Sequence, residues 1–217
     1  ISGIYNMNNS GPGIEITPTG NTGYAKSADI KIKVTQNGTA LDEGSFVYTI
    51  STDSNATPDK TIINNQKINI PVLTGIYYAV ATGCDMDSNC STAVSGKFYF
   101  DNEAPDIKIN PMGTNNVWKK NQSVNIEVTD NIELDWSKYV VSTSKTATPN
   151  VAISNGLENK NITGLTGDYY IVVKACDKLN NCNQINSDIY KFDNANPGIG
   201  NISVTPNAST KKITSTV

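Results

Sequence analysis

The sequence predicts an all-β chain that contains two antiparallel β-sandwiches in tandem. Short stretches of alternating apolar and polar residues recur, and no stretch has the periodicity of a helix. One pattern of strand, loop and strand also occurs twice, with cysteines at the same places. Cys84 and Cys90 in the first copy match Cys176 and Cys182 in the second, an offset of 92 residues. Self-similarity at this spacing indicates two copies of one module of about 90 residues each.

The ends of the modules are marked by a second repeated motif. Phe100-Asp101-Asn102 and Phe192-Asp193-Asn194 each close a strand and are followed by Pro105 and Pro197, which favour an extended linker. These motifs predict that a short Pro-containing linker joins the modules. The predicted division is residues 1–13 as the end of a preceding repeat, 14–104 as the first domain, 105–197 as the second, and 198–217 as the start of a third.

Each module is expected to contain seven short strands separated by turn residues. In the first module these are residues 14–18, 30–34, 46–51, 61–63, 67–72, the strand that begins at Gly75, and the strand Phe98–Phe100. Seven strands in so short a module are typical of an immunoglobulin-like sandwich. In the second module Lys174 should face water, and alternation then puts Cys176 on the outer side of the last hairpin.

Composition and charge limit the possible functions. The net charge is −3, and the 17 basic residues are all lysines that form no dense basic patch, so nucleic acid is not an expected partner. No apolar run approaches the roughly 20 residues that a membrane span needs. The chain has no histidine, which excludes imidazole bases and His-liganded metals. We therefore expect no enzyme and no cofactor.

The four cysteines form two identical pairs, each separated by five residues. A zinc site would require all four together, whereas each pair lies in a separate module. The spacing favours a disulfide within each loop, Cys84–Cys90 and Cys176–Cys182, over zinc or free thiols. Disulfides would place the protein in an oxidising compartment outside the cytoplasm.

The motifs together resemble a known family. Gly-x-Tyr-Tyr, Ala-Cys-Asp-x-x-x-Asn-Cys and Phe-Asp-Asn-x-x-Pro, all quoted from the second copy, resemble the tandem bacterial immunoglobulin-like repeats of secreted and cell-surface proteins. The resemblance covers nearly the whole chain. It implies an array of sandwiches whose Asp-Asn-x-x-Pro segments are the junctions between repeats, and it implies no particular ligand.

Two groups of acidic residues are weak candidates for calcium. Asp85, Asp87 and Asn89 have the spacing at which a calcium-binding loop begins, but Cys90 and Gly96 stand where its glycine and glutamate belong. The alternative is that Asp85 and Asp177 brace their turns by hydrogen bonds to the backbone. The second group follows the first module and consists of Asp101, Glu103 and Asp106. Its alternative is a solvated turn.

Aromatic and lysine side chains suggest three further features. Trp136 has no counterpart in the first module and could be an exposed ligand contact. Tyr24 and Trp118 precede lysines at matching places and are expected to pack at the edge of the core. Lys31 and Lys33 are candidates for a cross-link to an asparagine, although Asn125 and Glu127 stand at the matching places of the second module.

The leading hypothesis is a non-catalytic extracellular stalk segment of a repetitive, adhesin-like bacterial surface protein. Its partners would be neighbouring repeats of the same chain. The alternatives are a module that binds a host protein or a glycan, and a structural subunit of a phage tail, pilus or surface layer.

Overall fold

The computed structural model describes residues 9–200, 203–206 and 213–216. The chain divides into two compact units. The first unit comprises residues 1–107, 128–137 and 174–183, and the second comprises residues 108–127, 138–173 and 184–217. Two short segments of the second sequence repeat, a turn region and the cysteine loop, thus belong to the first unit. Most of the expected preceding repeat lies outside the described residues.

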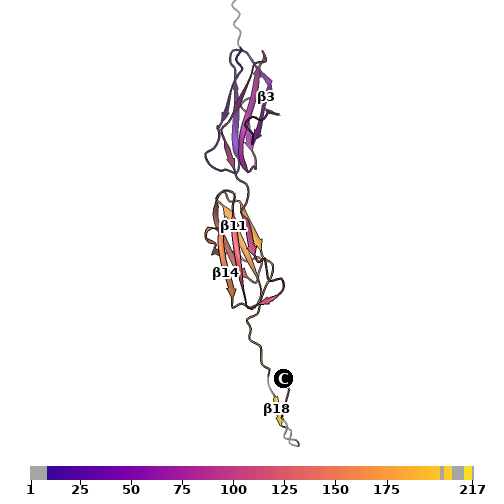
Figure 1. Cartoon of the computed structure of the whole chain (residues 1–217). Coiled ribbons are helices and arrows are strands. Elements are labelled where there is room, and N and C mark those ends of the chain that lie inside the picture. Colours follow the sequence, from indigo (N-terminus) through magenta and orange to yellow (C-terminus); the bar gives the residue numbers. More distant parts are fainter. Residues whose placement is uncertain (1–8, 201–202, 207–212, 217) are drawn as a thin grey trace, which may run out of the picture. The chain divides into compact units, whose positions relative to one another are not determined.

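The strands of the first repeat form two sheets (Figure 1). One has the order β1-β2-β5 and the other the order β4-β3-β6-β7, with β8 also paired to β6. The strands are β1 (Gly13–Thr17), β2 (Ala28–Thr35), β3 (Leu41–Ser51), β4 (Lys60–Thr61), β5 (Lys67–Ile70), β6 (Gly75–Asp85), β7 (Cys90–Val94) and β8 (Phe98–Phe100). All of the registered pairs among these strands are antiparallel.

The second repeat has the same order of strands with one addition. Its sheets are β14-β11-β9 and β10-β17-β15-β12-β13, with β16 paired to β15, and β10 pairs with β17 in parallel. The strands are β9 (Asp106–Asn110), β10 (Trp118–Lys119), β11 (Asn121–Thr129), β12 (Leu134–Ser142), β13 (Val151–Ala152), β14 (Leu157–Thr163), β15 (Gly167–Asp177), β16 (Cys182–Asn186) and β17 (Tyr190–Phe192). A three-residue 3-10 turn, η1 (Ser154–Gly156), precedes β14. Farther on, β18 (Ser203–Pro206) pairs with β19 (Ile213–Thr216).

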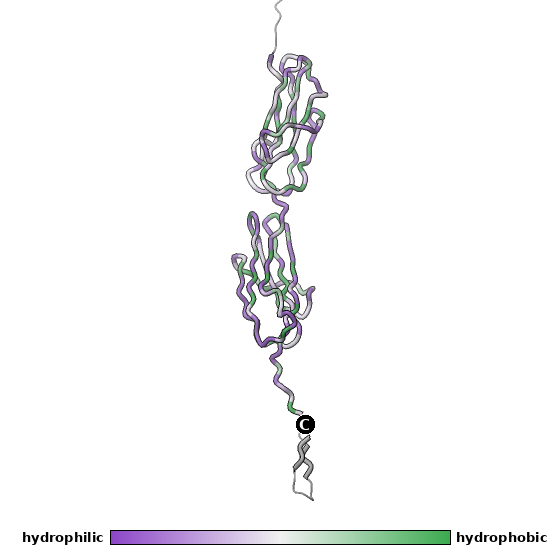
Figure 2. Tube along the Cα trace, turned by 45° about the vertical axis from the view of Figure 1, so that its right-hand side comes forward, coloured by the Kyte–Doolittle hydropathy of each residue, from purple (hydrophilic) through white to green (hydrophobic). Residues whose placement is uncertain are grey.

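Alternation of apolar and polar residues produces the strands, as the sequence predicts. In β2 the side chains of Ile30, Ile32 and Val34 are buried and those between them are exposed. In Figure 2 this alternation appears as hydrophobic and hydrophilic segments that follow one another along many strands. The phenyl rings of Phe98 and Phe100 stack in the core of the first repeat, 6.2 Å apart. No helix in the described part of the chain is long and apolar enough to cross a membrane.

The final strand of each repeat is broken in two by a buried serine. Between β7 and β8, the hydroxyl of Ser95 accepts a hydrogen bond from the amide of Ala79 (2.8 Å) and donates one to the carbonyl of Gly96 (2.8 Å). Ser187 makes the equivalent bonds to Ile171 and Asp188 between β16 and β17. The serine hydroxyl thus takes the place of a backbone partner where the strand is interrupted. In the first repeat this break explains why eight strands are observed where seven are expected.

The cysteine strand is more buried than the sequence predicts. Alternation does put Cys176 on the face opposite Ala175, but both residues are buried, and so is Val172. Strand β15 is central, with β12 on one side and β16 and β17 on the other. Neighbouring side chains can therefore cover both of its faces, and only part of Lys174 remains accessible.

The prediction that Tyr24 and Trp118 pack at the core edge is wrong. Trp118 is 55% exposed and Tyr24 is 38% exposed. Trp118 lies in β10, which pairs in parallel with β17, the final strand of the second repeat. Tyr24 precedes Ala25, which forms a single parallel bridge to Phe100 in the final strand of the first repeat. At a sheet edge such a ring has neighbours on one side only. Tyr24 packs against Tyr99, and Trp118 packs against the ammonium of Lys191.

Replacing Ser187 with alanine should destabilise the second repeat by about 1–3 kcal/mol, because the amide of Ile171 would lose its acceptor in a buried position. The matched control is Asn186→Ala, which changes the exposed residue next to it at the end of β16. Urea denaturation of the full chain measures both variants. An equal effect of the two substitutions would contradict the role of the hydroxyl.

Candidate functional site

Both expected disulfides are present. Cys84 is bonded to Cys90 and Cys176 to Cys182, with Cα–Cα distances of 4.0 and 4.1 Å. In the first repeat the two cysteines are direct partners in the register of β6 and β7. Each disulfide therefore closes the loop at the tip of one hairpin. The described part of the chain contains no free cysteine.

The residue after the first cysteine of each pair braces the loop. The Oδ1 atom of Asp85 accepts hydrogen bonds from the amides of Asp87 (3.0 Å) and Asn89 (2.8 Å), and Oδ2 accepts one from the Asn89 side chain (3.0 Å). Asp177 makes the same three bonds, to the Leu179 and Asn181 amides and to the Asn181 side chain. The hydrogen-bonding alternative proposed from the sequence is thus confirmed for both loops.

These bonds also affect protonation in the first repeat. The hydrogen bond from the Asn89 side chain holds the pKa of Asp85 below its usual value, and the backbone amides of Asn89 and Asp87 act in the same direction. The carboxylate of Asp87 accepts a hydrogen bond from the Thr39 hydroxyl (2.9 Å). The carboxylate of Asp85 is therefore occupied by donors of its own loop, and calcium binding by Asp85, Asp87 and Asn89 stays a prediction.

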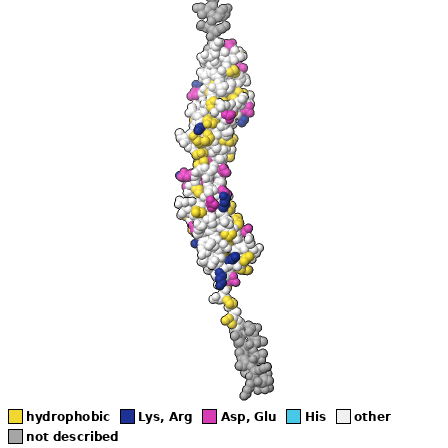
Figure 3. All heavy atoms as spheres, in the orientation of Figure 1, with side chains coloured by type: hydrophobic (Ala, Val, Ile, Leu, Met, Phe, Trp, Pro, Cys, Tyr) yellow, Lys and Arg dark blue, Asp and Glu magenta, His cyan; other side chains and the backbone are white. Residues whose placement is uncertain are grey.

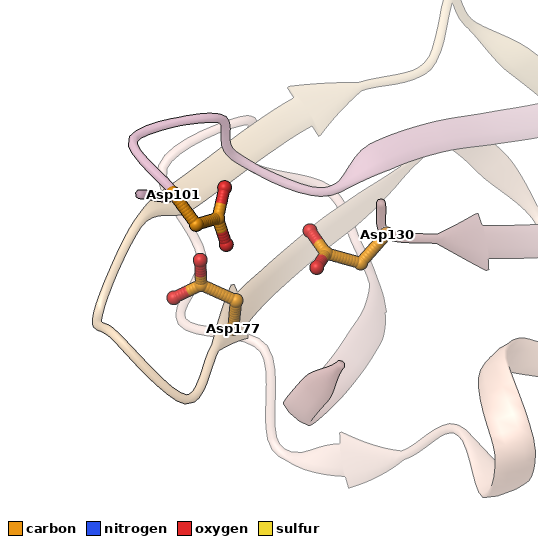
Figure 4. Close-up of side chains that lie close together, drawn as sticks. All are labelled: Asp101, Asp130 and Asp177. Carbon is orange, nitrogen blue, oxygen red and sulfur yellow. The ribbon is translucent and has the colours of Figure 1, made fainter. Parts of the chain in front are cut away.

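A different acidic cluster forms in the first unit. The carboxylates of Asp101, Asp130 and Asp177 each offer an oxygen within 4.8 Å of the others, and Figure 4 shows all three side chains turned towards one another. Asp101 follows β8, Asp130 follows β11, and Asp177 ends β15. Asp101 and Asp177 are each only 1% exposed. The cluster therefore combines one residue from the first sequence repeat with two from the second.

Only one of the predicted junction acids belongs to this cluster. Glu103 and Asp106 are exposed, and neither is part of the cluster. Sequence reasoning missed Asp130 and assigned Asp177 only a bracing role. No repeated motif marks Asp130, because Gln36 stands at the corresponding place of the first module.

Neighbouring amides fix the carboxylates in place. Oδ1 of Asp101 accepts hydrogen bonds from the amide of Glu103 (3.1 Å) and the side chain of Asn131 (3.2 Å). Oδ2 of Asp130 accepts bonds from the amides of Ile132 (3.0 Å) and Glu133 (3.1 Å). The Asn181 side chain, which bonds to Asp177, also donates to the carbonyl of Asp101 (3.1 Å). Each of the three side chains is thus held by donors from its own turn or from the turn of another member of the cluster.

The cluster lies beside a hollow of ≈ 200 Å³. The hollow is lined by Tyr24, Asp101, Ile132, Glu133, Lys178 and Leu179. The ammonium of Lys178 forms an ion pair with Glu133 (2.6 Å) at its edge. On the face drawn in Figure 3, lysines and acidic residues occur in small groups and not as one continuous patch. The arrangement offers oxygen ligands only, which suits binding of a hard cation.

Trp136, the candidate ligand contact, lies on β12 and is half-buried. The more exposed tryptophan is Trp118, which has a lysine neighbour at its ring. Ligand binding through Trp136 stays a prediction.

Comparison with known proteins gives distant structural similarities, among them two to fibronectin-III modules. The chain is similar to the fibronectin(III)-like modules of Clostridium thermocellum CbhA, with 13% identity, a TM-score of 0.32, and coverage of 87% of this chain and 99% of the other. It is also similar to the central fibronectin-III array of RIM-binding protein, with 13% identity, a TM-score of 0.24, and coverage of 93% and 68%. At these TM-scores neither similarity defines a shared function. No family model and no curated protein matches the sequence.

Loss of one disulfide should destabilise only its own hairpin. We expect Cys84→Ser combined with Cys90→Ser to lower the free energy of unfolding by about 2 kcal/mol, because the closed loop restricts the unfolded chain. The matched control is the pair Cys176→Ser and Cys182→Ser, which should affect the second repeat instead. Urea denaturation followed by hydrogen exchange assigns each loss to a repeat. Equal loss of protection in both repeats from one pair would contradict this expectation.

Acid should weaken the Asp85 turn. Because the pKa of Asp85 is lowered in the folded state, its contribution to stability is present above the unfolded pKa of about 4. That contribution is lost as the pH falls through the folded pKa. We expect the stability of the first repeat to decrease below about pH 4, and to decrease less in Asp85→Asn. Urea midpoints measured across this range are the test, and an identical pH dependence of the two proteins would contradict it.

Proposed function

We propose that this chain is a non-catalytic spacer segment of a repetitive extracellular protein. Residues 14–104 and 105–197 would be two of its repeats, and the segment would hold another domain at a distance from its attachment point. The proposed bacterial surface setting derives from the sequence resemblance. Disulfides in both hairpins support an oxidising compartment.

The observation that carries the proposal is the clamp at the end of each repeat. The side chain of Asn102 donates hydrogen bonds to the carbonyls of Lys26 (2.9 Å) and Leu73 (2.6 Å), and its amide donates to the hydroxyl of Thr74 (3.0 Å). The point at which the chain leaves the sandwich is therefore tied to two other segments of that sandwich.

The second repeat builds the same clamp with Asn194. Its side chain donates to the carbonyls of Lys120 (2.9 Å) and Leu165 (2.6 Å), and its amide donates to the hydroxyl of Thr166 (3.2 Å). A fixed exit is of little use to a module that acts alone. It is useful in an array, because it restricts the direction in which the chain runs from each repeat to the next.

The function can be tested by surface display. The full chain is placed between a membrane anchor and a peptide tag, and binding of a large antibody to the tag is measured. We expect the chain to increase tag accessibility as much as an unrelated pair of β-sandwiches of equal length does. The double variant Asn102→Ala with Asn194→Ala should lower the gain, because the exits lose their hydrogen bonds.

Other outcomes would favour the alternatives. Binding of the isolated chain to a glycan array or to a host protein, lost in Trp136→Ala, would indicate a ligand-binding module. Concentration-dependent polymerisation of the isolated chain would indicate a structural subunit. If the chain increased the accessibility of the tag only when it bound a ligand or polymerised, the spacer role would be contradicted.

A further inference from the structure

We propose that Asp101, Asp130 and Asp177 bind a divalent cation, and that this cation is Ca²⁺. The inference does not depend on the spacer function. It rests on the charge of the cluster, on a buried carboxylate oxygen that lacks a donor, on the proximity of the ligand atoms, and on a difference between the two repeats.

Charge is the first argument. Three carboxylates with oxygens within 4.8 Å of one another repel, and two of these side chains are almost entirely buried. A bound cation would compensate this concentration of negative charge. The described lysines nearby are engaged elsewhere. Lys178 pairs with Glu133 at 2.6 Å, and the ammonium of Lys26 donates to the carbonyl of Asn180 (3.3 Å).

An unpartnered oxygen is the second argument. Oδ1 of Asp130 is buried, and no described residue donates a hydrogen bond to it. Both hydrogen bonds that the Asp101 carboxylate accepts go to its Oδ1. A carboxylate oxygen that is removed from water and has no donor carries a free-energy cost. A metal ion at the centre of the cluster would satisfy Oδ1 of Asp130.

Calcium suits this cluster better than magnesium, because calcium accepts irregular coordination by mono- or bidentate carboxylates whereas magnesium requires near-ideal octahedral geometry. Ca²⁺ binds oxygen at about 2.3–2.6 Å, so two of its ligands can be up to about 5 Å apart. Mg²⁺ binds at about 2.0–2.1 Å and its ligands can be only about 4 Å apart. The carboxylate oxygens lie within 4.8 Å of one another, close enough to bind one calcium ion together. One member of the cluster, Asp101, also lines the hollow described above.

The first repeat lacks this combination of acids. When Pro12 is aligned with Pro105, Asn8 stands at the position of Asp101 in the sequence. When Val34 is aligned with Val128, Gln36 stands at the position of Asp130. Of the three positions, only that of Asp177 has an acid in the first repeat, which is Asp85. Its loop has an equivalent disulfide and equivalent hydrogen bonds. Bracing of the cysteine loop therefore needs one acid, and the group of three acids has no counterpart in the first repeat.

The test is a calcium titration of the full chain after treatment with a chelator. We expect saturable heat in isothermal titration calorimetry, with a dissociation constant of about 10⁻⁴–10⁻³ M, the range of extracellular calcium modules. Calcium should also raise the melting temperature. Asp130→Asn should weaken binding at least tenfold, because the substitution replaces the oxygen that lacks a donor with an amide group and removes one charge.

Two further measurements separate loss of a ligand from loss of the fold. Without calcium, Asp130→Asn should melt at or above the temperature of the unmodified chain, since it relieves repulsion in the empty cluster. Asp85→Asn is the matched control in the first repeat, and Glu103→Gln is the control at the junction. Both should bind calcium as the unmodified chain does.

The proposal is overturned if the unmodified chain shows no heat and no melting shift at about 10 mM calcium, well above the expected dissociation constant. It is also overturned if Asp130→Asn binds as tightly as the unmodified chain, or if Asp85→Asn weakens binding equally. Magnesium serves as the second probe. Magnesium binding as tight as calcium binding would overturn the assignment to calcium.

Discussion

The turn after the central strand of each repeat depends on one carboxylate. Asp85 and Asp177 each accept two backbone amides and one side-chain amide of their own five-residue loops. These bonds fix the chain as it reverses, so that the second cysteine returns opposite the first. The disulfide then closes a loop whose shape the aspartate already defines. In the second repeat the same aspartate also forms part of the acidic cluster, so the turn and the cluster cannot be altered independently.

Much of the fold could be predicted from the sequence, because a sandwich with one wet face leaves an alternating pattern. The apolar residues of β2 and the two phenylalanines of β8 are buried as that pattern requires. The pattern fails for β15, where Val172 and Cys176 are buried on the outer face. Burial of that face depends on the flanking strands, and alternation within one strand carries no information about them.

The candidate site was less predictable than the fold. The disulfides follow from the spacing of four cysteines, and Asp101 stands out because it lies in a repeated motif. Asp130 does not stand out, since it belongs to a turn that differs between the repeats, with Gln36 at the corresponding place. Its approach to Asp101 and Asp177 depends on three turns distant in sequence. Glu103 is close to Asp101 in sequence but is exposed, which shows that proximity along a linker is a poor guide to a shared site.

The broken final strand has a consequence for the behaviour of many such repeats in one chain. Strands β7 and β8 offer only short lengths of backbone at that border, and at the break the amide of Gly96 donates to the carbonyl of Thr19 while the amide of Asn21 donates to the carbonyl of Lys97. A strand from a neighbouring repeat that is still folding would find no long ladder of unpaired groups to join. Repeats of similar sequence, held at high local concentration, are prone to exchange strands during synthesis. The interruption thus favours each repeat folding onto itself.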